Sequence, residues 1–259
     1  MARINVTGSM VEFEQAGEGT SLLLLHSLLT ELTVFESIVP ALGRTHRVTC
    51  INLPGYGASA ALALGSVSEY ADHVARTMDA LSLPADTAVF GNGFGAFVAL
   101  ELAIRHGNRF GRLMVADTLA AFPEPARAPF RGMAEKVRAG GMPAVLDTAI
   151  GRMFPPEFAA AHPEVVAARK QALATADPEC FARAWLALAS LDLRASLSAI
   201  RNPALVMCGA LDQTTPPALA RELSQAIPGA EWREIPGSGH CPMLEQPEAL
   251  VALMNEFLA

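Results

Sequence analysis

Residues 89–97 read Val-Phe-Gly-Asn-Gly-Phe-Gly-Ala-Phe, and this short stretch decides the fold. A Gly-x-Ser-x-Gly pattern marks a sharp turn from a strand into a helix, which lifts the middle side chain above a sheet. Here Gly91 and Gly95 provide the outer glycines, and Gly93 stands where the serine would be. We therefore expect the turn to form without a side chain at its tip. Attack by a serine at position 93 is excluded.

Short apolar runs alternate with helical stretches on both sides of this turn. After an opening hairpin at Gly8, the runs cover residues 22–26, 48–53, 88–91, 113–117, 204–209 and 231–235. Continuous apolar strands separated by helices indicate a mostly parallel sheet with helices on both faces. Residues 94–107 are apolar on nearly every side, as expected of a helix buried beside the central strand. The pattern therefore predicts an α/β fold.

The alternation stops between about residues 120 and 195. This stretch opens with several prolines and continues as helical segments rich in Ala, Arg and Glu, without a convincing strand. It is too long for a connection and has too few strands to continue the sheet. We therefore expect residues 120–195 to form an inserted helical cap, and residues 1–119 and 196–259 to form the α/β core domain.

Composition limits the class of partner. The chain has 259 residues, of which 51% are hydrophobic, and its net charge of −7 gives no long-range attraction for nucleic acid or an anionic membrane. Its four cysteines are scattered without metal-ligand spacing, which is typical of reduced thiols. We find neither a signal peptide nor a membrane span. We expect a cytoplasmic protein that binds a small-molecule substrate without a metal or cofactor, and no pattern indicates its oligomeric state.

An acid and a histidine follow the turn along the chain. Asp212 comes just after the run at 204–209, and His240 lies in a glycine-flanked loop after the run at 231–235. In such a pair the aspartate orients the imidazole, and the histidine acts as general base and then as general acid. Taken singly, such an aspartate is more often a helix cap and such a histidine a solvated side chain. Asp117 is a second candidate for the acid, although a cap or turn role is favoured there.

The order of turn, aspartate and histidine is that of the α/β-hydrolases. Residues 26–35, His-Ser-Leu-Leu-Thr-Glu-Leu-Thr-Val-Phe, resemble the Asn-Ser-Leu-Gly-Thr-Asp-Leu-x-Met-Trp of the 3-oxoadipate enol-lactonase group. Residues 52–59, Asn-Leu-Pro-Gly-Tyr-Gly-Ala-Ser, resemble the glycine-rich turn of that group, and further matches run through the cap. The chain also resembles, less closely, the C–C bond hydrolases of aromatic ring-cleavage products. The resemblance implies an α/β-hydrolase fold that acts on a lactone, ester or diketone without a cofactor.

The resemblance also implies roles for residues around the turn. In this fold the backbone N–H groups of two residues form an oxyanion hole, and the matching positions are Leu28 and Phe94. Ordinary pocket lining is the alternative for both. Candidate substrate-binding residues are Ser27, Phe130, Arg152, Phe154 and Trp185, for which core packing or a solvated surface is at least as common.

Gly93 leaves four hypotheses open. In the first, which we favour, Asp212 and His240 activate water or the substrate directly, because a site kept only for binding has no need of the pair. In the second, the chain is an engineered variant in which glycine replaces a catalytic serine. The third is a non-catalytic small-molecule receptor. The fourth is a lyase or isomerase, whose product contains no added water.

Overall fold

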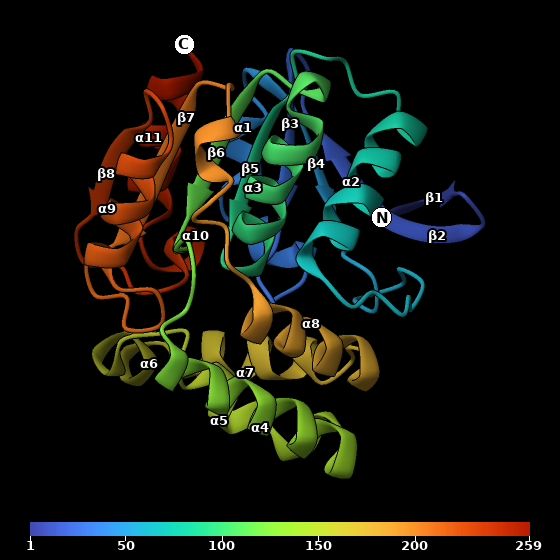
Figure 1. The fold of residues 1–259 in the computed structure, drawn as a ribbon, viewed down its shortest axis with the longest axis vertical. Helices are drawn as coiled ribbons and strands as arrows, with labels where there is room; N and C mark the ends of the chain where they lie inside the picture. Colours follow the sequence, from blue (N-terminus) through green and yellow to red (C-terminus); the bar gives the residue numbers. More distant parts are fainter.

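One sheet of eight strands runs through the molecule, with helices on both faces (Figure 1). The computed structural model describes residues 1–259. The order across the sheet is β1-β2-β4-β3-β5-β6-β7-β8, in which β1 pairs antiparallel with β2, β2 pairs antiparallel with β4, and all later pairs are parallel. This arrangement confirms the predicted fold class. The strands are β1 (Ala2–Val6), β2 (Ser9–Ala16), β3 (Thr20–Leu25), β4 (His46–Ile51), β5 (Ala88–Asn92), β6 (Arg112–Ala116), β7 (Ala204–Gly209) and β8 (Glu231–Ile235).

The central strands are apolar because both of their faces are covered. Every residue of β5 and β7 is buried, and β3 is buried from Ser21 onward. The register pairs Leu25 with Gly91 and Asn92 with Ala116, so β3, β5 and β6 end at the same edge of the sheet. The loops that follow parallel strands meet at such an edge, which is where open α/β sheets bind ligands.

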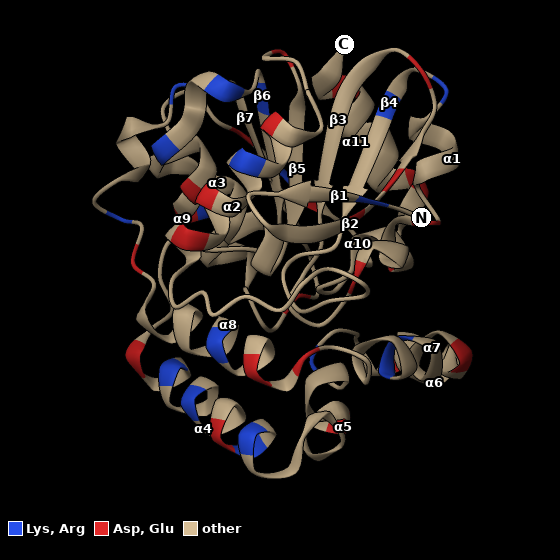
Figure 2. Ribbon diagram, turned by 90° about the vertical axis from the view of Figure 1, so that its right-hand side faces the viewer, with Lys and Arg blue, Asp and Glu red and all other residues tan.

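Helices of the core cover the two faces of the sheet. Figure 2 shows α2, α3 and α9 on one side of the sheet and α1 and α11 on the other. In α11, Leu250 and Met254 are buried while Asn255 and Glu256 are exposed, as its amphipathic pattern requires. None of the helices combines the length and the apolar composition that a membrane span requires. The core helices are α1 (Val39–Leu42), α2 (Val67–Ala80), α3 (Phe94–His106), α9 (Pro217–Ala226), α10 (Pro242–Glu245) and α11 (Pro247–Leu258), with short 3-10 helices η1 (Leu32–Phe35), η2 (Gly107–Arg109) and η4 (Leu197–Ala199).

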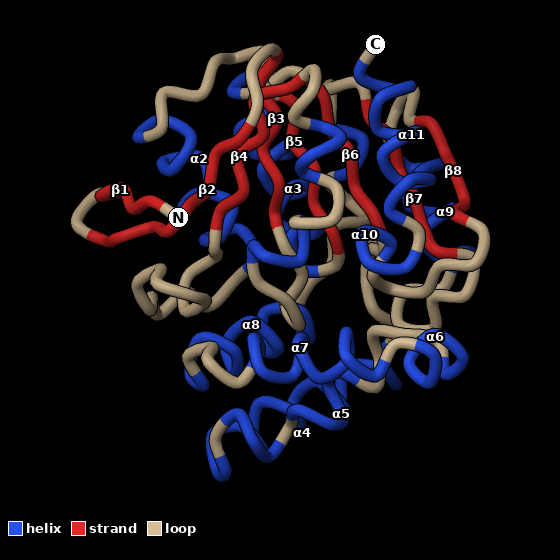
Figure 3. Tube along the Cα trace, turned by 180° about the vertical axis from the view of Figure 1, so that it is seen from behind, coloured by secondary structure: helices blue, strands red, loops and turns tan.

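The segment between β6 and β7 forms a separate layer below the strand ends (Figures 1 and 3). An isolated antiparallel bridge between Ala121 and Asp192 brings the two ends of this segment together. Arg169, on the cap, forms an ion pair of 3.2 Å with Glu31 in the loop after β3. The domain boundaries at 119/120 and 195/196 stay predictions. The cap helices are α4 (Glu124–Gly140), η3 (Met142–Ala144), α5 (Leu146–Ile150), α6 (Pro156–Ala161), α7 (Pro163–Leu173) and α8 (Pro178–Ser190).

Candidate active site

The turn at Gly93 joins β5 to α3. Gly93 has φ 52° and ψ −115°, a backbone conformation that costs a residue with a side chain about 1–3 kcal/mol and that glycine tolerates. Gly95 is required for a different reason, because a Cβ at this position would lie 2.2 Å from the carbonyl oxygen of Leu25. Helix α3 can therefore begin directly against the end of β3. The sharp turn forms as the sequence predicts, and no side chain extends from its tip.

Asp212 and His240 lie beside this turn, in the loops after β7 and β8. The His240 Nδ1 is 2.8 Å from the Asp212 Oδ2, and both side chains are buried. The Thr215 hydroxyl donates to Oδ2 at 2.5 Å, and the backbone N–H groups of Thr214 and Thr215 donate to Oδ1. On the other side of the ring, the His240 Nε2 lies 3.1 Å from the place that a Cβ on Gly93 would take. The imidazole is therefore fixed by the carboxylate and faces the tip of the turn.

The two side chains form an ion pair. Burial lowers the pKa of His240, but the Asp212 carboxylate more than offsets this and raises the pKa to about 9. Burial also raises the pKa of Asp212, but the charge and hydrogen bond of His240 bring it below its usual value. The imidazole is therefore mostly charged at neutral pH, and its capacity to act as a base grows as the pH rises toward 9.

Asp117, the second candidate for the acid, has other partners. Its carboxylate accepts a hydrogen bond from the Asn92 amide at 2.8 Å and another from the Gly209 N–H at 2.9 Å. Burial and the nearby charge of Asp212 raise the pKa of Asp117 well above its usual value. Asp117, Asp212 and His240 could each offer one ligand atom to a metal, all within 4.8 Å. Hydrogen bonds already engage both carboxyl groups, and only Asp212 bonds to the imidazole.

A cavity of about 30 Å³ lies above Gly93. Besides Gly93 and His240, it brings together the five residues Ser27, Leu28, Phe94, Phe130 and Trp185, which the sequence predicts to bind the substrate or the oxyanion. The indole N–H of Trp185 is buried without a hydrogen-bond partner in the protein. The rest of the wall consists of Leu29, Gly93, Phe97, Phe122, Leu188, Thr214, Thr215 and His240.

Two backbone N–H groups at this cavity lack a protein acceptor. Phe94 is the first residue of α3, where an N–H has no intrahelical partner, and the N–H of Leu28 donates to no protein group. The carbonyl of Leu28 accepts a hydrogen bond of 2.8 Å from the Tyr56 hydroxyl, which holds the loop in place. This geometry suits an oxyanion hole, and the assignment of Leu28 and Phe94 to that role stays a prediction.

His26 orients the same loop, although no role was predicted for it. Its Nε2 accepts a hydrogen bond from the Leu53 N–H at 3.0 Å, so its Nδ1 carries the proton that is donated to the carbonyl of Ser27 at 2.7 Å. Burial lowers the pKa of His26 to about 4, which keeps the ring neutral as this pattern of bonds requires. Position 26 therefore fixes the backbone on which Ser27 stands.

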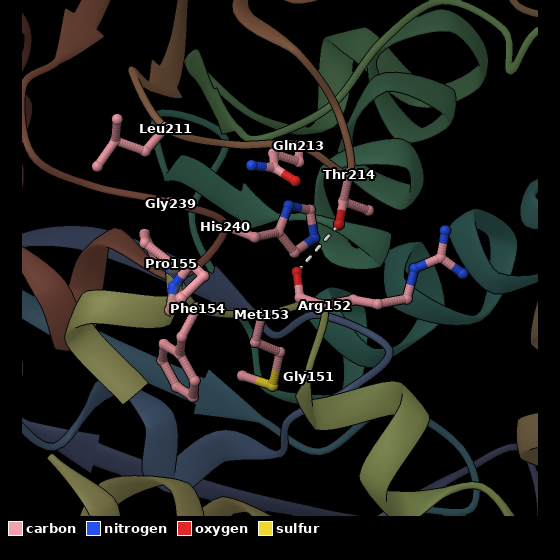
Figure 4. A pocket seen from close by; sticks show the side chains of 11 residues that line it. Gly151, Arg152, Met153, Phe154, Pro155, Leu211, Gln213, Thr214, Gly239 and His240 are labelled. Carbon is pink, nitrogen blue, oxygen red and sulfur yellow. Dashed lines mark hydrogen bonds between the residues drawn. The ribbon is translucent and has the colours of Figure 1, made fainter. Parts of the chain in front are cut away.

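Arg152 and Phe154 lie in a different pocket, which has a volume of about 250 Å³. Figure 4 shows His240 in its wall and the Arg152 side chain extending away from the imidazole. The backbone carbonyl of Arg152 accepts a hydrogen bond of 3.1 Å from the Thr214 hydroxyl, while Phe154 stacks on Phe158 in the cap. The structure thus separates these two predicted residues from the five that line the cavity over Gly93. His240 borders both spaces.

The sequence did not identify several residues of the cavity wall. Thr214 and Thr215 follow Asp212 so closely that their bonds to its carboxylate could have been expected from the tendency of aspartate to bind the N–H groups after it. Phe97 and Phe122 carry no such signal, because an apolar side chain in a cavity wall has the same sequence pattern as one in the core.

Comparison with known proteins gives a consistent picture. The family model described as alpha/beta hydrolase fold matches residues 20–247. The chain is 30% identical to 3-oxoadipate enol-lactonase 2 of Acinetobacter baylyi, over 92% of this chain and 89% of that protein. It is also 30% identical to the polyketide synthase ThaQ of Burkholderia thailandensis, over 97% of this chain but only 12% of that much longer protein. The enol-lactonase structure from Burkholderia xenovorans LB400 superimposes with a TM-score of 0.93 at 29% identity, covering 99% of both chains.

Proposed function

The chain belongs to the alpha/beta hydrolase fold family, and from that premise we propose that it hydrolyses a small carbonyl compound, a lactone or an ester, without a serine nucleophile at the turn. One observation carries the proposal. The pair formed by Asp212 and His240 is complete, and the His240 Nε2 lies 3.1 Å from the place of the missing Cβ at Gly93. A base is therefore aimed at the position where the reaction takes place in this family.

The proposed reaction uses water as the nucleophile. The His240 Nε2 removes a proton from water as the water oxygen bonds to the carbonyl carbon, and the N–H groups of Leu28 and Phe94 bind the oxyanion. The carbonyl then re-forms, the bond to the leaving oxygen breaks, and His240 gives that oxygen its proton. The products are a carboxylic acid and an alcohol, which for a lactone remain one molecule. Asp212 stabilises the imidazolium between the two proton transfers.

Features of the cavity bear on the alternatives. Burying an ion pair carries a desolvation cost, and a receptor without chemistry gains nothing obvious from it. The Ser27 hydroxyl lies 2.4 Å from the place of a Cβ on Gly93, so a serine at position 93 would require the Ser27 side chain to shift.

The test is the replacement of His240. We expect His240→Ala to lower kcat toward p-nitrophenyl acetate and an enol-lactone by about 10²- to 10⁴-fold, the usual contribution of a general base. His46→Ala is the matched control, because His46 is also buried but bonds to Thr20 on β3, outside the cavity wall. Unchanged activity in His240→Ala would falsify the proposal. A product made in ¹⁸O water that contains no ¹⁸O would instead support the lyase or isomerase hypothesis.

A further inference from the structure

The hydroxyl of Ser27 lies in the space that a serine at position 93 would need. A Cβ on Gly93 would be 2.4 Å from the Ser27 Oγ and 3.0 Å from the Ser27 Cβ. Ser27 is buried in the loop after β3 and lines the cavity together with Gly93 and His240. A hydroxyl therefore remains beside the histidine, but it comes from a different strand end.

This hydroxyl is free while its own backbone is held. The carbonyl of Ser27 accepts hydrogen bonds from the His26 Nδ1 at 2.7 Å, from the Thr30 N–H at 3.2 Å and from the Thr30 hydroxyl at 3.3 Å. The Ser27 Oγ, in contrast, bonds to no group of the protein, and Ser27 lines the cavity. A fixed backbone with a free hydroxyl is the arrangement expected of a side chain that binds something in the cavity.

The cavity itself indicates which molecule the Ser27 hydroxyl binds. Its volume of about 30 Å³ exceeds the roughly 10–15 Å³ that a cavity needs to hold one water molecule. Buried water needs two to four polar partners, and the wall supplies two acceptors, the Ser27 Oγ and the His240 Nε2, while the unpaired N–H groups of Leu28 and Phe94 stay available for the oxyanion. Thr214 and Thr215 also line the cavity, but their hydroxyls bond to the Arg152 carbonyl and to Asp212, and the other wall residues are aromatic and aliphatic.

We propose that Ser27 binds the hydrolytic water in the space above Gly93. One hydrogen of the water is donated to the His240 Nε2 and the other to the Ser27 Oγ, which leaves a lone pair of the water oxygen directed at the carbonyl carbon. The proton passes to His240 and no bond to Ser27 forms or breaks. The inference rests on the proposed function and assigns a catalytic role to Ser27 within it.

The experiment compares Ser27→Ala with Ser21→Ala. Ser21 is a matched control because it is a buried serine on β3 whose hydroxyl also lacks a partner, outside the cavity wall. With p-nitrophenyl acetate, we expect Ser27→Ala to lower kcat about 10- to 100-fold with a smaller change in KM, as misplacement of a reacting group does. Ser27→Thr retains the hydroxyl and should keep more of the activity, whereas Ser21→Ala should match the wild type.

Two outcomes overturn the inference in different ways. If His240→Ala is inactive while Ser27→Ala keeps full kcat, the role of Ser27 is wrong and the proposed function stands. If His240→Ala keeps full activity, both fail. A rapid-quench mass measurement adds a second readout: we expect no acyl group on the wild-type protein during turnover, and an acyl group on Ser27 would show that this serine is itself the nucleophile.

Discussion

The two sides of the cavity over Gly93 differ in how their polar atoms are used. On one side, hydrogen bonds from His240, Thr214 and Thr215 engage both oxygens of Asp212. On the other side, Gly93 has no side chain and the Ser27 hydroxyl has no protein partner. The side that would provide the base is complete, whereas the side that would provide the nucleophile is open. The difference indicates a site that retains its general base but takes its nucleophilic oxygen from a group other than a side chain at position 93.

The largest expected effect comes from the complete side. Asp212→Asn removes the charge that raises the pKa of His240 and allows the wrong tautomer of the ring, so we expect kcat to fall by about 10⁴-fold, as in comparable triads. The measurement is steady-state hydrolysis of p-nitrophenyl acetate. Asp192→Asn is the control, because Asp192 pairs with Arg194 at the surface. If kcat of Asp212→Asn falls less than tenfold, the pair formed by Asp212 and His240 does not provide the general base.

The pH profile tests the same side without a mutation. Because the Asp212 carboxylate raises the pKa of His240 to about 9, kcat/KM should rise nearly tenfold per pH unit from pH 6 to 8 and level off near 9. The folded pKa lies above the unfolded value of 6.5, so the pair stabilises the fold fully below pH 6.5 and this contribution is lost as the pH rises through 9. Thermal unfolding between pH 6 and 10 measures that loss. A rate that is flat above pH 7 would contradict the raised pKa.

On the open side, we expect the main effect of a serine at position 93 to be a lower free energy of unfolding. Gly93→Ser places a side chain at φ 52° and a Cβ 2.4 Å from the Ser27 Oγ, so we expect a loss of about 1–3 kcal/mol in the free energy of unfolding. Chemical denaturation measures it. Adding Ser27→Gly removes the contact with the Ser27 side chain and should recover part of this loss, while the backbone strain remains. If the double variant is no more stable than Gly93→Ser alone, the two positions do not compete for one space.

The smallest effect is expected from Arg152, which belongs to neither side. Its guanidinium lies 5.9 Å from the ring centre of Phe130 and points away from His240 (Figure 4). Arg152→Ala therefore removes a contact between a cation and an aromatic ring worth about 0.5–1 kcal/mol at an exposed site, and KM should change less than about fivefold. Initial rates over a range of substrate concentration test this. A large rise in KM confined to substrates with a carboxylate would restore Arg152 as a binding residue.

The sequence was informative where a residue type is tied to a local conformation. The glycines at 91, 93 and 95 predict the turn, and the positions of Asp212 and His240 after buried strands predict their meeting, because parallel strands end at one edge of the sheet. The relation between Ser27 and Gly93 could not be predicted in the same way. It depends on how closely two strand ends approach and on the orientation of a single hydroxyl, and neither leaves a pattern along the chain.

The predictions in the cap show the same limit. Phe130 and Trp185 do line the cavity, but Arg152 and Phe154 line another pocket, since a motif in a helical segment does not specify which way its side chains point. Asp117 shows the same limit of sequence-based prediction within the core. Its position after β6 made it a candidate acid, and only the contacts with Asn92 and Gly209 assign it elsewhere.

The cavity over Gly93 is built from two layers of the molecule. Phe130 of α4 and Trp185 of α8 supply cap side chains to its wall, while Gly93 and His240 come from the strand ends of the core. Substitutions on the cap side can therefore change which substrates fit without altering the pair formed by Asp212 and His240.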